Sequence, residues 1–283
     1  MLTINLFNGL VYGALLIIMC SGLALIYGLR RVVNFSHGAL YMLGAYIGYS
    51  VAAHSNFWVA LVVAPLVMGI IGVLLDRYGL RLLQDRDPLS LVLVTFGLLL
   101  IIEDVVHTVW SGGTRSLGIP DAMNVSVDLL GTTVPAYRIF VMGVGFVVAI
   151  GLSLWLRYSR VGLFVRAAST DPTTTAMQGI NTDTLSAGVV GLGAALAGLA
   201  GVVAAPFLSL SLSMGSDVLI DSFIVVVVGG LGSLVGAFVA AMVLGMVQAL
   251  GAVYLPNLSA LLPFMIMIAV LIWKPSGFAG SRT

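Results

Sequence analysis

Charged side chains are scarce in this chain. Of its 283 residues only 8% are Asp, Glu, Lys or Arg, whereas soluble domains carry about 25%. Hydrophobic residues make up 60% of the chain, and its mean hydropathy is +1.15. The sequence therefore predicts an integral membrane protein, and no stretch of it fits a separate water-soluble domain.

Cysteine and an excess of basic charge are also lacking. The single Cys20 cannot form an internal disulfide. The formal net charge is +1, so nucleic acid is not an expected partner. Residues 1–8 carry no basic stretch of the kind that opens a cleaved signal peptide, and none is expected.

The motifs of common enzymes are absent from the sequence. There is no GxxxxGK[ST] phosphate-binding loop, and the only lysine, Lys274, follows the last apolar run. There is no HExxH metal site and no GxSxG nucleophile motif. His37, His54 and His107 are too widely spaced to suggest a metal cluster. We therefore expect no enzyme activity, no ATP hydrolysis and no cofactor in this chain.

Nine apolar runs are present instead, and a spanning helix needs about 20 mostly apolar residues. Long strands of alternating polarity are absent, which favours helices over a barrel. The expected fold is an all-α polytopic membrane protein with about 8–9 spanning helices, forming one transmembrane domain over residues 1–283. The runs are 6–29, 36–53, 57–75, 89–110, 138–156, 184–205, 216–229, 233–253 and 258–273.

The seventh run, 216–229, is short and is followed directly by a glycine-rich turn that contains Gly230 and Gly232. It can be a broken or re-entrant helix, because irregular backbone is tolerated in a membrane where protein or a water-filled cavity covers it. Whether this run crosses the membrane is left open by the sequence.

The distribution of basic residues predicts the orientation. Cytoplasmic loops carry an excess of Lys and Arg. An N-terminus outside and a C-terminus in the cytoplasm leave only Arg115 and Arg138 outside. The basic residues then placed inside are Arg30, Arg31, Arg77, Arg81, Arg86, Arg157, Arg160, Arg166, Lys274 and Arg282.

Residues 157–183 form a polar break on this basic side. Asp171 is a good helix N-cap, Pro172 suits the first helical position, and Gly179 suits the position after the last one. The sequence thus predicts a short helix of about two turns between two spanning helices. Such an element is suited to contact a partner outside the membrane.

Small residues predict close helix packing in the sixth run. Gly193, Ala197 and Gly201 recur at four-residue spacing, a pattern that lets two helices approach closely. Tight packing inside one bundle explains this pattern without a functional role.

The first polar turn contains Asn34, Ser36, His37 and Gly38. Asn34 or Ser36 can cap the second helix. The same residues can instead form an inner gate or contact a cytoplasmic partner, and both interpretations stay open. A serine–histidine hydrolase is disfavoured, because side chains of adjacent residues on a helix point in different directions.

Several polar residues lie inside or beside apolar runs. Glu103 and Asp221 are candidates for a transport pathway, because an acidic group at mid-bilayer costs about 2.5–3.5 kcal/mol and therefore needs water nearby. Gly230 and Gly232 of the glycine-rich turn are further candidates. Exposure at the membrane surface is the alternative for Glu103. The helix dipole explains Asp217 without a function, and Asp221 lies one turn deeper.

The outer loop, 111–137, contains Arg115 near its start and is followed by Arg138. These two arginines can meet acidic groups of a soluble partner outside the membrane. They can equally lie among the lipid headgroups.

Three separated motifs resemble the permeases of branched-chain amino acid ABC importers, of the LivH type. They are GLALIYGLRRVVNFSHG (22–38) with YMLGAY (41–46), GLFVRAASTDP (162–172) with GINTD (179–183), and VGGLGSLVGA (228–237). They occur in the expected order and span nearly the whole chain. The EAA loop of other importer classes is matched only loosely.

The resemblance implies an importer-type permease bundle in a bacterial inner membrane. It implies a second permease of the LivM type, two ABC ATPase subunits that carry ATP and Mg, and a soluble binding protein outside. The segment 166–181 would be the cytoplasmic coupling helix, with Arg166, Asp171, Pro172, Thr174, Ala176, Gly179 and Asn181 facing an ATPase. Three consecutive threonines at 173–175 are a departure, because β-branched Thr weakens a helix.

Other functions remain open at this stage. The same scaffold can import urea, short amides or other amino acids. An ATP-independent channel or secondary carrier is a weaker alternative, because titratable groups inside the membrane are few and the predicted short helix would have no role.

Overall fold

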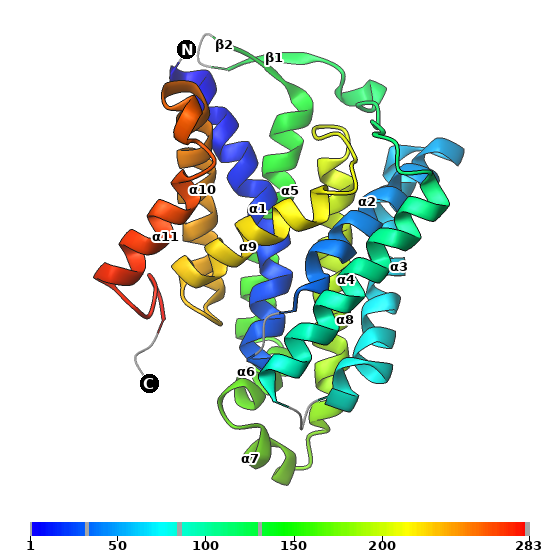
Figure 1. Cartoon of the computed structure of the whole chain (residues 1–283), viewed down its shortest axis with the longest axis vertical. Helices are drawn as coiled ribbons and strands as arrows, with labels where there is room; N and C mark the ends of the chain where they lie inside the picture. The colour runs from blue at the N-terminus through cyan, green and yellow to red at the C-terminus, as the bar shows by residue number, and fades with distance from the viewer. Residues whose placement is uncertain (1, 32–33, 84–86, 130–131, 281–283) are drawn as a thin grey trace.

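The computed structural model describes residues 2–31, 34–83, 87–129 and 132–280. Arg86 and Arg282, two of the basic residues used to predict orientation, and Val32 and Val33 of the first motif lie outside these ranges. The described chain is an all-α membrane bundle with one short hairpin (Figure 1). Six of its helices are long and apolar enough to cross a membrane.

All nine apolar runs are helices, which confirms the predicted fold class. Seven of the nine begin and end within three residues of the expected bounds, the first begins four residues earlier and the last begins four residues later. The helices are α1 Leu2–Arg30, α2 Ser36–His54, α3 Phe57–Tyr78, α4 Pro88–Trp110, α5 Ala136–Tyr158, α8 Thr182–Ala204, α9 Met214–Gly229, α10 Leu234–Tyr254 and α11 Leu262–Trp273.

Short elements connect these helices. At one end of the bundle lie α6 Arg160–Thr170 and α7 Pro172–Met177, and we call this the α7 end (Figure 1). At the opposite end, the hairpin end, β1 Ser126–Leu129 pairs antiparallel with β2 Thr132–Pro135. Three single turns of 3₁₀ helix, η1 Leu80–Leu83, η2 Asp121–Met123 and η3 Pro256–Leu258, complete the chain. The described parts of the predicted outer loop, 111–129 and 132–137, thus contain regular elements.

The centre of the bundle is formed by α1, α2 and α8. Residues 13–26 of α1 are buried, as is most of α2 up to Tyr46. Other helices, and not lipid, therefore surround α2. This explains why α2 can contain several polar and small residues and be less apolar than its neighbours.

Glycines bring these central helices together. A Cβ atom on Gly201 of α8 would collide with the backbone oxygen of Tyr41 in α2, and one on Gly44 would collide with Gly198. A Cβ on Gly193 would lie 2.6 Å from the Ile26 side chain of α1. The small-residue pattern predicted to mediate packing therefore does so on two sides of α8.

The short α9 crosses the bundle obliquely (Figure 1). Its 16 residues correspond to about 24 Å, less than the hydrocarbon thickness of about 30 Å. The preceding segment compensates by entering the bundle: Leu210 is fully buried and pairs through its backbone with Arg115 near the hairpin end. The other end of α9 faces the α7 end, since Val227 lines a cavity of about 570 Å³ to which Ser169 of α6 also contributes.

The C-terminal tail docks on the end of α9. The backbone N–H groups of Phe278 and Ala279 donate to the carbonyl oxygens of Val228 and Gly229, at 2.8 and 3.0 Å. The tail thus lies toward the α7 end, whereas the first turns of α1 lie near the hairpin end (Figure 1). The two chain ends are on opposite sides of the bundle.

We expect Gly201→Ala to lower the thermal unfolding midpoint, because the added methyl would force α8 away from α2. Gly188→Ala in the same helix is the matched control. A Cβ there meets nothing within 4 Å, so the midpoint should stay unchanged or rise slightly through better helix propensity, which is worth about 1 kcal/mol. Tryptophan fluorescence during heating in detergent measures the unfolding midpoint of each variant. Equal midpoints for the two variants would contradict this account of the core.

Candidate functional site

The α6–α7 segment is built by local capping. The Ser159 side chain accepts a hydrogen bond from the Gly162 N–H at 2.8 Å and begins α6. Asp171 ends α6 and begins α7, where its side chain accepts from the Thr174 N–H at 3.0 Å. Pro172 occupies the first position of α7. The short capped helix predicted from the sequence is therefore present, at Pro172–Met177.

The three threonines are compatible with α7 because their hydroxyls bond locally. The Thr174 hydroxyl donates to the Asp171 carboxylate, and the Thr175 hydroxyl donates to the Asp171 carbonyl oxygen at 2.7 Å. The hydrogen bonds donated by Thr174 also lower the pKa of the Asp171 carboxyl. Gly179 follows α7 with a positive φ of 81°, and Asn181 then caps α8 by accepting from the Thr184 N–H at 2.9 Å.

The helix α6 was not predicted. The signals for it were present: a capping serine at 159, and apolar residues Val161, Val165 and Ala168 at helical spacing. Arg157, Arg160 and Arg166 interrupt this apolar pattern, and the stretch was therefore interpreted as a polar break.

The segment exposes most of its surface at the α7 end. Thr175 is the one buried residue described in α7, and Met177 is 78% exposed. All seven residues predicted to face an ATPase lie together in this part of the fold and are exposed: Arg166, Asp171, Pro172, Thr174, Ala176, Gly179 and Asn181.

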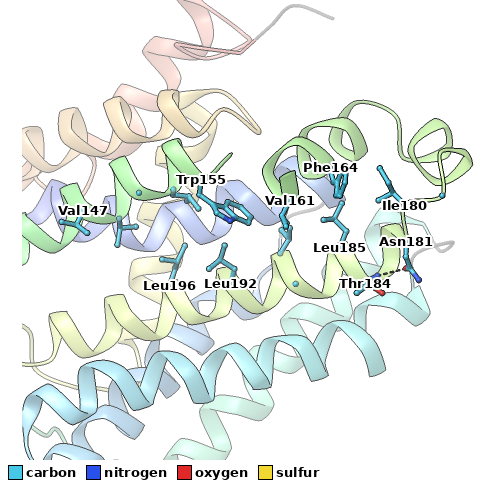
Figure 2. Close-up of a pocket in the computed structure, with 16 residues that line it drawn as sticks. Val147, Trp155, Val161, Phe164, Ile180, Asn181, Thr184, Leu185, Leu192 and Leu196 are labelled. Carbon is cyan, nitrogen blue, oxygen red and sulfur yellow. Dashed lines mark hydrogen bonds between the residues drawn. The ribbon is translucent and has the colours of Figure 1, made fainter. Parts of the chain in front are cut away.

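An apolar cavity of about 970 Å³ lies beneath one side of this segment (Figure 2). It separates α6 from α5 and α8. Trp155 of α5 and Phe164 of α6 point toward it, as do Leu185 and Leu192 of α8 (Figure 2). The helix α6 nevertheless meets the end of α5 closely, since a Cβ on Gly162 would lie 2.5 Å from the Leu156 carbonyl oxygen.

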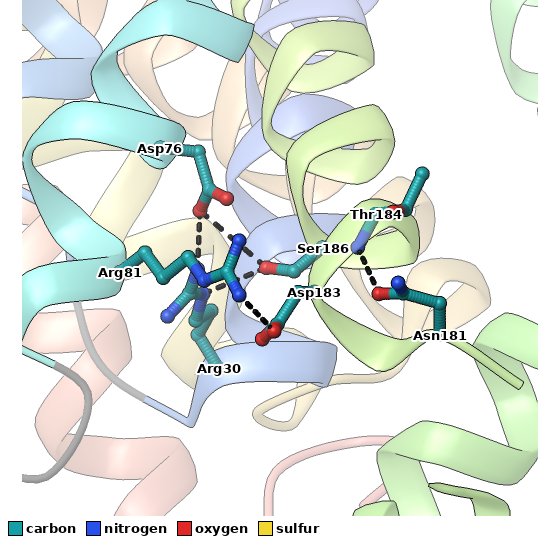
Figure 3. Close-up of polar contacts among 7 residues, drawn as sticks. All are labelled: Arg30, Asp76, Arg81, Asn181, Asp183, Thr184 and Ser186. Atoms are coloured by element: carbon teal, nitrogen blue, oxygen red, sulfur yellow. Dashed lines mark hydrogen bonds and ion pairs between the residues drawn. The ribbon is translucent and has the colours of Figure 1, made fainter.

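The other side of the segment is held by ion pairs at the start of α8 (Figure 3). Arg30, at the end of α1, pairs with the buried Asp76 of α3 and donates through Nε to the Ser186 hydroxyl at 2.8 Å. Arg81 of η1 pairs with Asp183 in the first turn of α8. The sequence reasoning missed this network, although an acid inside the third apolar run, Asp76, was the signal for it.

The predicted first turn is buried inside the bundle. Asn34 accepts hydrogen bonds from the Ser36 N–H at 3.0 Å and the Ser36 hydroxyl at 2.6 Å in the turn before α2. The N-cap position of α2 is Phe35, and no side chain caps the helix. The His37 ring is 0% exposed, with Nε2 3.1 Å from the Met19 carbonyl oxygen. Gly38 packs against the Gly215 backbone. In this conformation the four residues cannot touch a soluble partner, and a gating role stays a prediction.

The two acidic pathway candidates tie helices together. Asp221 of α9 accepts from the Tyr12 hydroxyl at 2.6 Å and from the Gln248 side-chain amide at 3.0 Å, and thereby links α1, α9 and α10. Glu103 of α4 accepts from the Ser216 hydroxyl of α9 at 2.9 Å. Both carboxylates are half-buried. Whether they also line a pathway stays a prediction.

Gly230 and Gly232 meet a structural requirement. Both have positive φ, 101° and 83°, in the turn between α9 and α10. Gly230 is also buried against the tail, where a Cβ would lie 2.5 Å from the Gly280 nitrogen. Their place at the docked tail explains the glycines without a pathway role.

The two arginines at the hairpin end are engaged within the chain. Arg115 donates to the Trp110 carbonyl oxygen at 3.0 Å and lies over the Tyr49 ring at 5.5 Å. Arg138 pairs with the Asn8 side chain and lies over the Phe207 ring at 5.4 Å. Both side chains are half-buried, so each is less available to a soluble partner than the sequence suggested.

Comparisons with a family model and with known proteins point to the same family. The model of the family described as "Branched-chain amino acid transport system / permease component" matches residues 5–271. The chain is 27% identical to the high-affinity branched-chain amino acid transport system permease protein LivH of Escherichia coli (strain K12), over 98% of this chain and 94% of that protein. It is 28% identical to the corresponding protein BraD of Pseudomonas aeruginosa, over 98% and 95%. No solved structure matches the chain.

We expect Arg30→Met to lower the free energy of unfolding by about 3–5 kcal/mol, because Asp76 would lose its counter-charge inside the bundle. The double variant Arg30→Met/Asp76→Leu should recover most of this loss. Arg81→Met is the matched control for an exposed pair, whose side chains are 48% and 35% exposed, and should cost less than about 1 kcal/mol. Thermal unfolding in detergent compares the stability of the unmodified protein and these three variants. A double variant no more stable than Arg30→Met would contradict the prediction.

Proposed function

Because this chain belongs to the family of branched-chain amino acid transport permeases, we propose that it is one transmembrane permease subunit of an ATP-driven importer for branched-chain, hydrophobic amino acids. It forms the translocation pathway with a second, related permease of the LivM type. Two ABC ATPase subunits bind and hydrolyse ATP with Mg, and a soluble binding protein delivers the amino acid.

The observation that carries this proposal is the exposed α6–α7 segment. Two short, separately capped helices stand out from the spanning helices at one end of the bundle (Figure 1). A helix that exposes nearly all of its residues, Met177 included, has no internal packing role that explains it. It is suited to fill a groove on an ATPase.

The surroundings of the segment support a role in transmitting movement. Its C-terminal side continues into α8, whose first turn is tied to α3 and α1 by the Asp183 and Ser186 contacts. Its N-terminal side, α6, rests on the apolar cavity. A push on α7 would therefore act on α8 together with α3 and α1.

Alternating access follows from this arrangement. Closure of the ATPase dimer pushes the two permeases so that their shared cavity opens outward, and hydrolysis reopens the inner side. High affinity resides in the binding protein, so the permease needs only a weak, mostly apolar site. Glu103 and Asp221, at polar contacts between helices, are the candidates for groups near this pathway.

The proposed setting is the bacterial inner membrane, with the α7 end in the cytoplasm. The support is the concentration of basic residues at that end: Arg30, Arg77, Arg81, Arg157, Arg160 and Arg166. The hairpin end, with Arg115 and Arg138, is then outside and faces the binding protein.

A cysteine at Thr174, in a Cys20→Ser background, should form a disulfide with a cysteine in a co-expressed ATPase subunit, and its yield should change with nucleotide. The reason is that Thr174 is exposed on α7, whereas Cys20 is buried. Non-reducing electrophoresis measures the product. Asp121→Cys, exposed at the hairpin end, is the control and should give none. No product from any position between Asp171 and Gly179 in a folded protein would remove the coupling role.

Uptake of radiolabelled leucine into vesicles that contain the whole transporter should require ATP on the α7 side and the binding protein on the other side. Excess valine or isoleucine should compete, because the site is expected to recognise a branched apolar side chain. Uptake without ATP would instead indicate a channel or carrier. ATP-dependent uptake of urea or a short amide, but not of leucine, would agree with the importer role and contradict the proposed substrate class.

A further inference from the structure

One side of the bundle exposes acidic residues far from the helix ends. It is formed by α4 and α9, which lie on the near side of the bundle in Figure 1. The Ser216 hydroxyl of α9 donates to Glu103 of α4 at 2.9 Å and joins the two helices. Asp104 of α4 and Asp217 of α9 are exposed, and Asp221 of α9 is half-buried. We call this side the α4–α9 face.

The carboxylates of this face lie at the depth of the hydrocarbon. Asp104 is six residues before the end of α4, which corresponds to about 9 Å. The whole of α4, 23 residues, is about 35 Å long, only about 5 Å more than the hydrocarbon thickness. Asp221 is bonded to Tyr12, the eleventh residue of α1 and about 15 Å from its start. The short Asp side chain cannot extend to the headgroups as Lys and Arg do.

The sides formed by α3 and α5 are different. Their charged residues all lie within three residues of a helix end. The exposed residues in the middle of these two helices are apolar or glycine. Acidic residues inside a spanning segment almost always face other protein or a water-filled cavity. The α4–α9 face therefore meets a partner in the membrane, whereas the α3 and α5 sides are suited to lipid.

The charge of the α4–α9 face favours a different chain over a second copy of this one. Neither α4 nor α9 contains Lys or Arg. A two-fold pairing would bring the same patch of both copies together, and the carboxylates would then meet one another. Like charges that face each other across an interface oppose association. The partner that suits this face presents hydrogen-bond donors or basic groups instead.

We propose that the α4–α9 face is the side on which this chain meets the second, related permease, with a water-filled part of the pathway between the two chains. The proposal rests on the proposed function, which supplies such a partner. Asp104, Asp217 and Asp221 border the water. Leu100 and Ile220, one turn away from Asp104 and Asp217 on the same helix sides, contact the partner. The ammonium group of a passing amino acid meets this acidic wall, and the partner supplies the group that meets its carboxylate.

The test is photocrosslinking in the complete transporter in membranes. Single cysteines in a Cys20→Ser background are labelled with benzophenone maleimide, which reacts on illumination with the molecule beside it. Leu100→Cys and Ile220→Cys report on the α4–α9 face, and Leu66→Cys on α3 and Ile150→Cys on α5 are matched controls. The four residues replaced are apolar and 49%, 48%, 63% and 58% exposed. We expect a product with the second permease from the first two positions and none from the controls.

The outcomes separate this proposal from the importer role. A product with the second permease from the controls alone, or from no position, would overturn the assignment of the face. ATP-dependent leucine uptake by the same membranes would show that the importer role stands all the same. A product that links two copies of this chain through the face would overturn the choice of partner.

A water-soluble thiol reagent tests whether water reaches the face. Asp104→Cys and Asp217→Cys should react with a charged methanethiosulfonate in the assembled transporter, because a thiol ionises in water and not in hydrocarbon. Leu66→Cys and Ile150→Cys should stay unmodified. Co-purification of the second permease shows that each variant has assembled. No reaction at the two acidic positions, or equal reaction at the controls, would overturn the water-filled pathway on this side.

Discussion

Close backbone contact between α1, α2 and α8 determines the position of the other elements. Glycines at the crossings let these helices approach until backbone touches backbone, as at Gly201 and Tyr41. In a membrane there is no hydrophobic driving force between helices, so this packing supplies much of the association. The remaining helices then surround the core and carry the lipid-exposed residues, such as Leu66 and Ile70 of α3.

The same core makes the α7 end asymmetric. The helix α8 leaves the core and meets α7 near a start that an ion pair joins to Arg81 of η1. There Ser186 is hydrogen-bonded to Arg30 of α1 and Asp76 of α3. The helix α6 meets the end of α5 closely at Gly162, where a Cβ would lie 2.5 Å from the Leu156 carbonyl oxygen, and Arg166 donates to the Arg157 carbonyl oxygen at 3.4 Å. It also borders an apolar cavity. The two sides of the exposed segment therefore differ: polar contacts surround the start of α8, whereas α6 borders an apolar cavity.

Polar groups inside the bundle mainly connect helices that are distant in sequence. Asp221 links α9 to α1 and α10, Glu103 links α4 to α9, and Asp76 links α3 to α1 and α8. A carboxylate surrounded by hydrocarbon is costly, and each of these lowers its cost by accepting hydrogen bonds. The second oxygen of Asp76 is one of four buried polar atoms with no hydrogen-bond partner among the described residues, with His37 Nδ1, the Tyr46 hydroxyl and Arg115 Nε.

Local features of the sequence determined the helices and their ends. Apolar runs of spanning length predicted all nine apolar helices, and Asp171, Pro172 and Gly179 predicted α7, because capping depends on residues only a few positions apart. Tertiary structure alone decided that the turn around His37 is buried, that Arg115 and Arg138 bond within the chain, and that Arg30 meets Asp76. The physical reason is distance along the chain: Arg30 and Ser186, for example, are 156 residues apart, and only the packing of α1, α3 and α8 brings them together.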